Sequence, residues 1–159
     1  MACFQKPVNF YRVQSANSYT IETPDGFESS THYWMGYLHW INARTIRNHL
    51  DWYNRESTAF ISVFSTQESA AKRAKYLRSR GFQGVKVAKL SCDSLKEGIL
   101  SIQFQDSLID LPVLEDALTV FFPVSAANRL LNLQHPMIMA EEWLALDHIP
   151  RGMITWMNI

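Results

Sequence analysis

The stretch that most constrains the fold is AEEWLALDHIPRGMI, which runs from Ala140 to Ile154. It places a carboxylate, Glu142, at the head of a short apolar run, as expected for a strand that is buried beyond its first residue. A tight turn and a second strand should follow. The pattern therefore predicts a closing strand pair over about 141–146 and 153–157.

The rest of the chain predicts a β-rich α+β domain, because strands and helices do not alternate in a βαβ rhythm. A helix is expected after Ser65-Thr66-Gln67-Glu68, which has the form of a capping box, and Gly81 should end it in a left-handed conformation. Residues 17–31 are rich in turn formers and predict a loop or short hairpin. Further strands are expected over 8–14, 59–64, 84–90, 99–104 and 118–122, and further helices over 41–50 and 123–133.

Length and composition fit a single domain over residues 1–159. A chain of 159 residues can bury a real core, and 47% hydrophobic residues is ordinary for a globular protein. Lys+Arg and Asp+Glu both number 15, so the formal net charge is +0. This balance argues against a protein held on nucleic acid by bulk electrostatics. The tryptophans are expected in the core or along a cleft; they are Trp34, Trp40, Trp52, Trp143 and Trp156.

Several classes of site and location are not expected. Cys3 and Cys92 are too few for a disulfide scaffold and lack metal-site spacing, so both should be free thiols. No His, Cys, Asp and Glu cluster has ligand spacing, and the glycines form no phosphate-binding loop. No stretch approaches the roughly 20 apolar residues of a membrane span. We expect a cytoplasmic protein with no membrane partner, and secretion after removal of a signal sequence is the alternative.

Motifs in four parts of the chain follow the order that ADP-ribosyltransferases use. Residues 11–13 (YRV) resemble their opening Tyr-Arg strand, and His49 precedes the next strand, as a cleft histidine does in the enterotoxin group. Residues 60–65 (FISVFS) resemble the aromatic-apolar-Ser-Thr-Ser strand, with a helix directly after it. Glu142 and the later Ile149-Pro150 resemble the segment that carries the catalytic glutamate.

The chain therefore resembles the ADP-ribosyltransferase fold of cholera-like enterotoxin A subunits. It is also similar to poorly characterised fungal domains of this type, which share the segments His-x-Asp-Trp (residues 49–52) and Phe-Ile-Ser-Val-x-Ser. The resemblance implies split antiparallel β-sheets with flanking helices and a strand-lined cleft that binds NAD as substrate. It implies mono-ADP-ribosyl transfer, in which nicotinamide is released and ADP-ribose passes to water or to an unknown protein, nucleic-acid or small-molecule acceptor.

The resemblance also implies a role for each site residue. Arg12 would hold the diphosphate, because a guanidinium binds phosphate with two parallel hydrogen bonds. Glu142 would stabilise an oxocarbenium-like state and bind ribose hydroxyls, as carboxylates do in glycoside cleavage. Ser62 would orient the glutamate and the ribose. His49 would hydrogen-bond the adenosine ribose or a phosphate.

Other positions are expected to complete the cleft. Phe64 or Trp143 could stack on the cationic nicotinamide ring, since aromatic faces attract cations. The alternative for both rings is a place in the core, which is their more usual role. Residues 131–139 would form the acceptor-recognition loop, with Gln134 and His135 as its polar candidates. Glu141 brings a further carboxylate, although strand alternation points it away from the face of Glu142 unless a bulge intervenes.

The chain departs from the family pattern at several positions. Ala140 stands where the family has Glu or Gln, and alanine neither accepts a proton nor orients a guanidinium. The resemblance therefore does not imply arginine as the acceptor. Val63 and Phe64 replace the Thr and Ser of the serine strand, and Asp147-His148 replace a Gly-Gly turn.

Structural interpretations stand beside the functional ones. Arg12 could be a salt-bridged strand residue, Ser62 a core serine, His49 a partner of a helix C-terminus, and Glu142 an edge charge that blocks aggregation. One alternative is a catalytically degenerate member of the fold that binds a nucleotide or protein. Another is an unrelated α+β interaction domain with an aromatic surface near Tyr33-Trp34.

Overall fold

The computed structural model of the chain describes residues 4–29, 41–51, 58–134 and 141–158. The larger sheet is built from β1 (Asn9–Gln14), β4 (Phe60–Phe64), β5 (Lys86–Ser91), β6 (Lys96–Phe104), β7 (Ser107–Glu115), β8 (Val120–Pro123), β9 (Glu142–Leu146) and β11 (Ile154–Trp156). The smaller sheet comprises β2 (Ile21–Thr23), β3 (Gly26–Glu28) and β10 (His148–Pro150). The helices are α2 (Ala43–Leu50), α3 (Gln67–Ser79), α4 (Val124–Leu131) and the short 3-10 helix η1 (Arg151–Met153).

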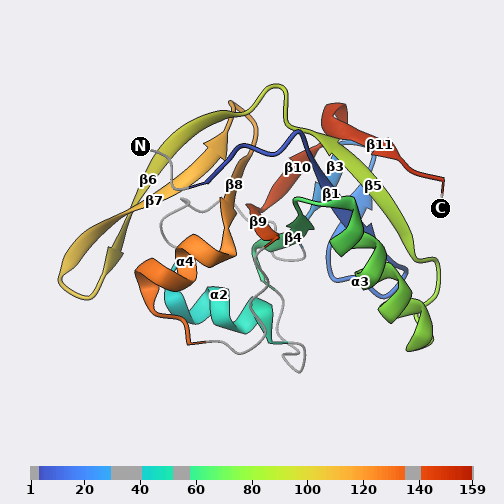
Figure 1. Cartoon of the computed structure of the whole chain (residues 1–159), viewed down its shortest axis with the longest axis horizontal. Coiled ribbons are helices and arrows are strands. Elements are labelled where there is room, and N and C mark those ends of the chain that lie inside the picture. The colour runs from blue at the N-terminus through green and yellow to red at the C-terminus, as the bar shows by residue number, and fades with distance from the viewer. Residues whose placement is uncertain (1–3, 30–40, 52–57, 135–140, 159) are drawn as a thin grey trace.

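The two sheets are antiparallel at every described strand pair, which confirms the α+β class. The larger one has eight strands in the order β11-β5-β1-β4-β9-β8-β7-β6, and the smaller one has the order β10-β3-β2. In Figure 1, α2, α3 and α4 lie along one side of the strands, while β3 and β10 lie on the other. None of the described helices is long and apolar enough to cross a bilayer.

The closing segment forms the predicted strands, but the expectation that they pair with each other is wrong. β9 lies between β4 and β8, whereas β11 pairs with β5 and β10 with β3. The chain changes sheets at Asp147, whose φ of 70° is left-handed. Aspartate tolerates this conformation better than most residues, so Asp147 can occupy the left-handed position of the turn.

Helix α3 follows the predicted helix, with a shifted start. Thr66 is its N-cap and accepts a hydrogen bond from Ser69 N at 3.2 Å. The N-cap is therefore one residue later than Ser65, which the predicted capping box placed there. Glu68 instead pairs with Lys72 one turn later, at 3.2 Å. At the other end, Gly81 has a φ of 85°, and Phe82 N donates to Leu77 O at 3.0 Å. This is the left-handed ending that the glycine predicts.

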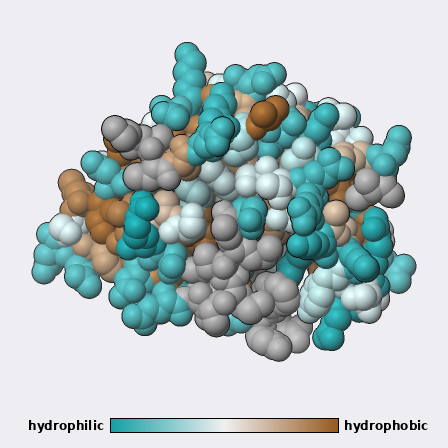
Figure 2. Space-filling view, in the orientation of Figure 1, coloured by the Kyte–Doolittle hydropathy of each residue, from teal (hydrophilic) through white to brown (hydrophobic). Residues whose placement is uncertain are grey.

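Residues 91–113 contain the predicted strand over 99–104, which β6 confirms, and they contribute most of a long β-hairpin. β6 and β7 pair along nine positions from Lys96↔Glu115 to Phe104↔Ser107. Ile99 and Leu108 are 62% and 73% exposed, so apolar side chains on these strands do not mark a buried face. Figure 2 shows a hydrophobic patch on the side where Figure 1 places this hairpin.

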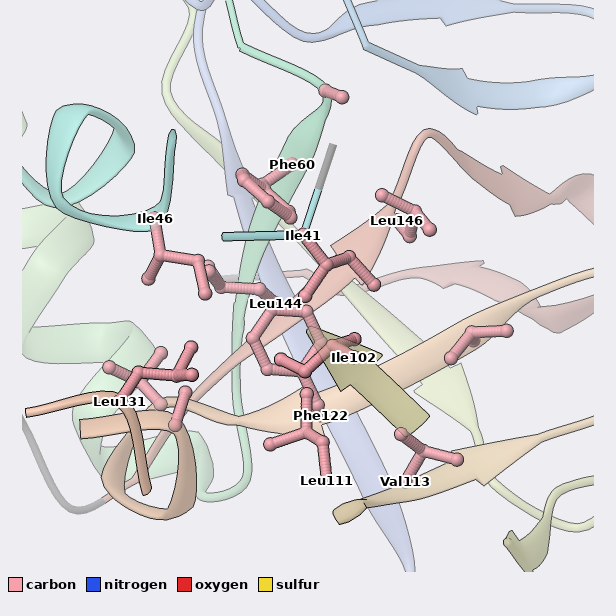
Figure 3. Packing of buried hydrophobic residues seen from close by; sticks show 14 of the residues in the cluster. Ile41, Ile46, Phe60, Ile102, Leu111, Val113, Phe122, Leu131, Leu144 and Leu146 are labelled. Carbon is pink, nitrogen blue, oxygen red and sulfur yellow. The ribbon is translucent and has the colours of Figure 1, made fainter. Parts of the chain in front are cut away.

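Three hydrophobic clusters cover the two faces of the larger sheet. The first packs α2 and α4 against β4 and β6–β9, with Phe60, Phe122 and Leu144 at its centre (Figure 3). The third packs α3 against β1, β4 and β5, and includes Phe64 and Ala70. The second lies on the opposite face, where β3, β10 and η1 cover it. The helix-covered face therefore has two separate apolar regions that meet along β4.

The larger sheet is weakly joined at its centre. β1 and β5 pair at six positions from Asn9↔Ser91 to Gln14↔Lys86, whereas β1 and β4 have one registered pair, Tyr11↔Phe64. Beyond that pair the backbone ladder between β1 and β4 stops. The sheet thus has a seam between a β11-β5-β1 part and a β4-β9-β8-β7-β6 part.

Candidate functional site

Strands β4 and β9 place a serine and a glutamate together on the helix-covered face. Phe64 pairs with Glu142 and Ser62 with Leu144, so all four side chains project from the same face of the sheet. On β4, Ser62 lies between Phe60, which belongs to the first hydrophobic cluster, and Phe64, which belongs to the third. Its hydroxyl donates to Glu142 Oε2 at 2.9 Å.

Helix α2 brings His49 onto the same serine. The side chain of Asn42 caps the helix start by accepting from Thr45 N at 2.9 Å, and the buried Ile46 and Leu50 anchor one side of the helix in the core. His49 lies in the last turn, with Nε2 2.7 Å from Ser62 Oγ.

The hydrogen bonds around His49 have a defined direction. Burial, and secondarily the charge of Arg12, lower the pKa of His49 to about 3, so the ring is neutral at pH 7. Because the Ser62 hydroxyl donates to Glu142, His49 Nε2–H must donate to Ser62 Oγ. Nδ1 is then an acceptor, and its partner is the hydroxyl of Thr58. A chain of donors therefore runs from Thr58 through His49 and Ser62 to Glu142.

Arg12 lies at the seam of the sheet. It is 8% exposed, and its Nη1 donates to Ser62 O at 2.9 Å, across the gap where β1 and β4 no longer pair. Its Nε and Nη2 donate to Gln14 Oε1 at 3.1 and 2.9 Å. Burial, followed by the charge of Arg73, lowers the pKa of Arg12 to about 10, although Glu142 opposes the shift. The guanidinium is still charged at pH 7.

Glu142 is the acidic group of this cluster. Burial raises its pKa, while the hydrogen bond from Ser62 and the charges of Arg73 and Arg12 act in the opposite direction. Among the residues that the structure describes, no hydrogen bond is made to Glu142 Oε1. Within the described part of the chain, Ser62 therefore holds Oε2, and Oε1 has no hydrogen-bond partner there.

The two candidate stacking residues, Phe64 and Trp143, both pack in the core, in agreement with their structural interpretation. Trp143 is 4% exposed and follows Glu142 in β9, so it projects to the opposite face. There its ring centroid lies 4.9 Å from that of Phe4 and 5.0 Å from that of Phe10. Phe64 is 5% exposed and packs in the α3 cluster. Neither ring offers an open face to a nicotinamide.

The structure describes two of the three predicted acceptor-recognition residues, Gln134 and Glu141, and no hydrogen bond among the described residues links either side chain to the cluster. Gln134 is an exposed residue after α4 with a φ of 54°. Glu141 lies in a turn before β9 rather than in the strand, and its carbonyl accepts from Ser65 N at 2.8 Å. His135 and Ala140 lie outside the described residues, as do Tyr33-Trp34.

The structure adds three residues that the sequence interpretation missed. Gln14 binds Arg12, Thr58 binds His49, and Arg73 on α3 contributes charge near Glu142. The spacing of Arg12 and Gln14 was a usable signal, because residues two apart in a strand share a face. The other two had no comparable local signal. Within the described ranges, no group of three or more His, Cys, Asp or Glu residues could hold a metal ion.

Comparison with known proteins gives a family for the chain. No curated protein and no solved structure matches it. The model of one protein family, described as "Domain of unknown function (DUF7587)", matches residues 5–156. Because this match covers nearly the whole chain, the protein belongs to the DUF7587 family.

Proposed function

We propose that this protein is an NAD-dependent mono-ADP-ribosyltransferase of the ADP-ribosyltransferase fold. The observation that carries the proposal is the meeting of Arg12, His49, Ser62 and Glu142 in one cluster, in which Arg12 is buried and the other three are half-buried. These residues come from four separate parts of the chain, and hydrogen bonds link Arg12 and His49 to Ser62 and Ser62 to Glu142.

The proposed reaction breaks the bond between C1′ of the ribose and the nicotinamide nitrogen. Both bonding electrons go to the nitrogen, so nicotinamide leaves as a neutral molecule and C1′ becomes oxocarbenium-like. The acceptor or water then adds to C1′ through a lone pair and releases one proton. The products are nicotinamide, ADP-ribosylated acceptor or free ADP-ribose, and a proton.

Each residue has a role that its contacts support. Ionised Glu142 would use its available oxygen to stabilise the positive charge at C1′. Ser62 and His49 hold the other carboxylate oxygen in place, because their donors point along the chain to Glu142. Arg12 is a buried cation that can bind the diphosphate. Partial burial limits the water around these groups and strengthens their electrostatic interactions.

The test is nicotinamide release from NAD by the purified protein, measured beside Glu142→Gln and Glu141→Gln. Both substitutions remove one carboxylate from neighbouring positions, but only Glu142 belongs to the cluster. We expect release by the wild type, a loss on the order of 100-fold or more in Glu142→Gln, and near-normal release in Glu141→Gln. Labelled NAD added to a cell lysate then identifies the acceptor.

Two results would overturn the proposed activity. Equal release by the wild type and Glu142→Gln would show that the glutamate does not act in the reaction. If neither protein releases nicotinamide nor transfers label, the enzyme assignment fails. NAD binding by calorimetry in that second case would identify a catalytically degenerate binding module, and absence of binding would direct the search to protein partners.

A further inference from the structure

We infer that Gln14 is a positioning residue: it orients Arg12 toward an anionic group, the diphosphate of the substrate, and leaves the positive charge of Arg12 unneutralised. The inference rests on the proposed function for the identity of the ligand. Gln14 and Arg12 are 5% and 8% exposed and occupy alternate positions of β1. Their side chains therefore leave the strand on the same side and meet in the protein interior.

The amide of Gln14 has one orientation that satisfies both of its partners. Its Oε1 accepts from Nε and Nη2 of Arg12, and its Nε2 donates to Thr20 O at 2.7 Å. A guanidinium only donates and a carbonyl only accepts, so the reverse orientation would lose all three hydrogen bonds. Thr20 is itself buried. The side chain of Gln14 is thus fixed between the residue before β2 and Arg12.

These contacts leave part of Arg12 available. A guanidinium has five N–H groups, and Gln14 and Ser62 O accept from three different ones. One N–H on Nη1 and one on Nη2 therefore remain without an acceptor among the described residues. Two N–H groups on adjacent nitrogens can bind two oxygens of a phosphate. Gln14 occupies the Nε side of the guanidinium and directs its end toward the ligand.

The charge of the cluster also favours an anion. Gln14 and Ser62 O are neutral acceptors, and no described carboxylate lies within ion-pair distance of Arg12. Glu142 acts on it only as a more distant charge, and Arg73 adds a second positive charge nearby. A buried cation that lacks a counterion is costly, so a ligand that supplies negative charge gains affinity there. A carboxylate at position 14 would make the same contacts to Arg12 and remove this advantage.

The test compares Gln14→Glu, Gln14→Met and a control, Gln103→Glu, which adds the same charge at an exposed position of β6. Calorimetry measures the Kd for ADP-ribose, which carries the diphosphate but cannot be turned over. We expect a loss of about tenfold or more in Gln14→Glu, because Arg12 is neutralised. Gln14→Met leaves Arg12 charged but removes the hydrogen bonds that orient it, so we expect a smaller loss of affinity for ADP-ribose. Gln103→Glu should bind like the wild type.

Kinetics provide a readout that a merely structural role would not move. Gln14→Glu should raise KM for NAD more than it lowers kcat, and it should raise KM much less for nicotinamide riboside, which has no phosphate. Gln14→Glu and Gln14→Met proteins that bind ADP-ribose as the wild type does would overturn the inference, even if NAD turnover is present. Wild-type binding of ADP-ribose that depends on Gln14, without turnover, would overturn the enzyme assignment alone. If the wild type binds neither ADP-ribose nor NAD, both the inference on Gln14 and the enzyme assignment are overturned.

Discussion

The neutral state of His49 predicts how the stability of the protein depends on pH. The ring accepts a hydrogen bond at Nδ1 from Thr58 and lies near the charge of Arg12. Protonation would turn Nδ1 into a donor facing Thr58 and would place a second positive charge in a mostly buried cluster. The perturbation is a decrease from pH 7 to pH 5, applied to the wild type and to His49→Gln, which keeps a neutral side chain at every pH.

The magnitude follows from the two pKa values. His49 has a pKa of about 3 in the folded protein, and the ordinary value of 6.5 applies to the unfolded chain. The unfolded chain binds the proton first, so this contribution is fully present above pH 6.5 and is lost as the pH falls toward 3. One pH unit corresponds to about 1.4 kcal/mol. At pH 5 the loss is therefore about 2 kcal/mol, which is an upper value because the ring keeps some exposure.

The assay is urea unfolding at pH 7, 6 and 5, with the free energy of unfolding extrapolated to water. The wild type should lose up to about 2 kcal/mol more than His49→Gln over this range. Glu142 has the opposite dependence, because its raised pKa adds stability as the pH falls. Both proteins contain Glu142, so comparing them isolates the histidine. Equal losses in the two proteins would refute a neutral, buried His49.

Two further outcomes follow from the fold and the site. Gly26→Ala should lower the free energy of unfolding by about 3 kcal/mol, because Gly26 has a φ of 130° and a Cβ there would lie 2.0 Å from Ile149 O. Thermal denaturation measures the effect. Gly152→Ala is the control, because the space around Gly152 is open. Ser62→Ala should slow nicotinamide release by about tenfold or more, and its acid limb should move to higher pH, because the lost hydrogen bond is one that lowers the pKa of Glu142. An unchanged pH–rate profile in Ser62→Ala would contradict the coupling of these two residues.

The sequence predicts local structure wherever one face of an element is buried. β1, β4 and α3 have regular apolar spacing and strong end signals, so their positions were predictable. Of the β6–β7 hairpin only the strand over 99–104 was predicted, because Ile99 and Leu108 are exposed and obscure the alternation of apolar and polar residues. Strand order is set by contacts between distant segments, so the closing strands could be located but not paired.

The site shows the same division. Arg12, His49, Ser62 and Glu142 were identified from short motifs, and the structure brings them together. The motifs could not show that Trp143 belongs to the core, because its position after Glu142 in β9 turns the ring to the opposite face. The role of Thr58 depends on how α2 packs against β4, and local sequence does not encode that packing.

The seam between β1 and β4 gives a structural criterion for comparing this chain with others of its family. Here a guanidinium spans the gap where backbone pairing stops, so part of the continuity of the sheet depends on the residue to which the proposed function assigns the diphosphate. A relative with an apolar residue in place of Arg12 would have no polar group to fill that gap. Its most stable arrangement is a continuous ladder, because unpaired buried backbone groups are costly. A closed seam would therefore mark a member that has lost the site, and an open one a member that still carries it.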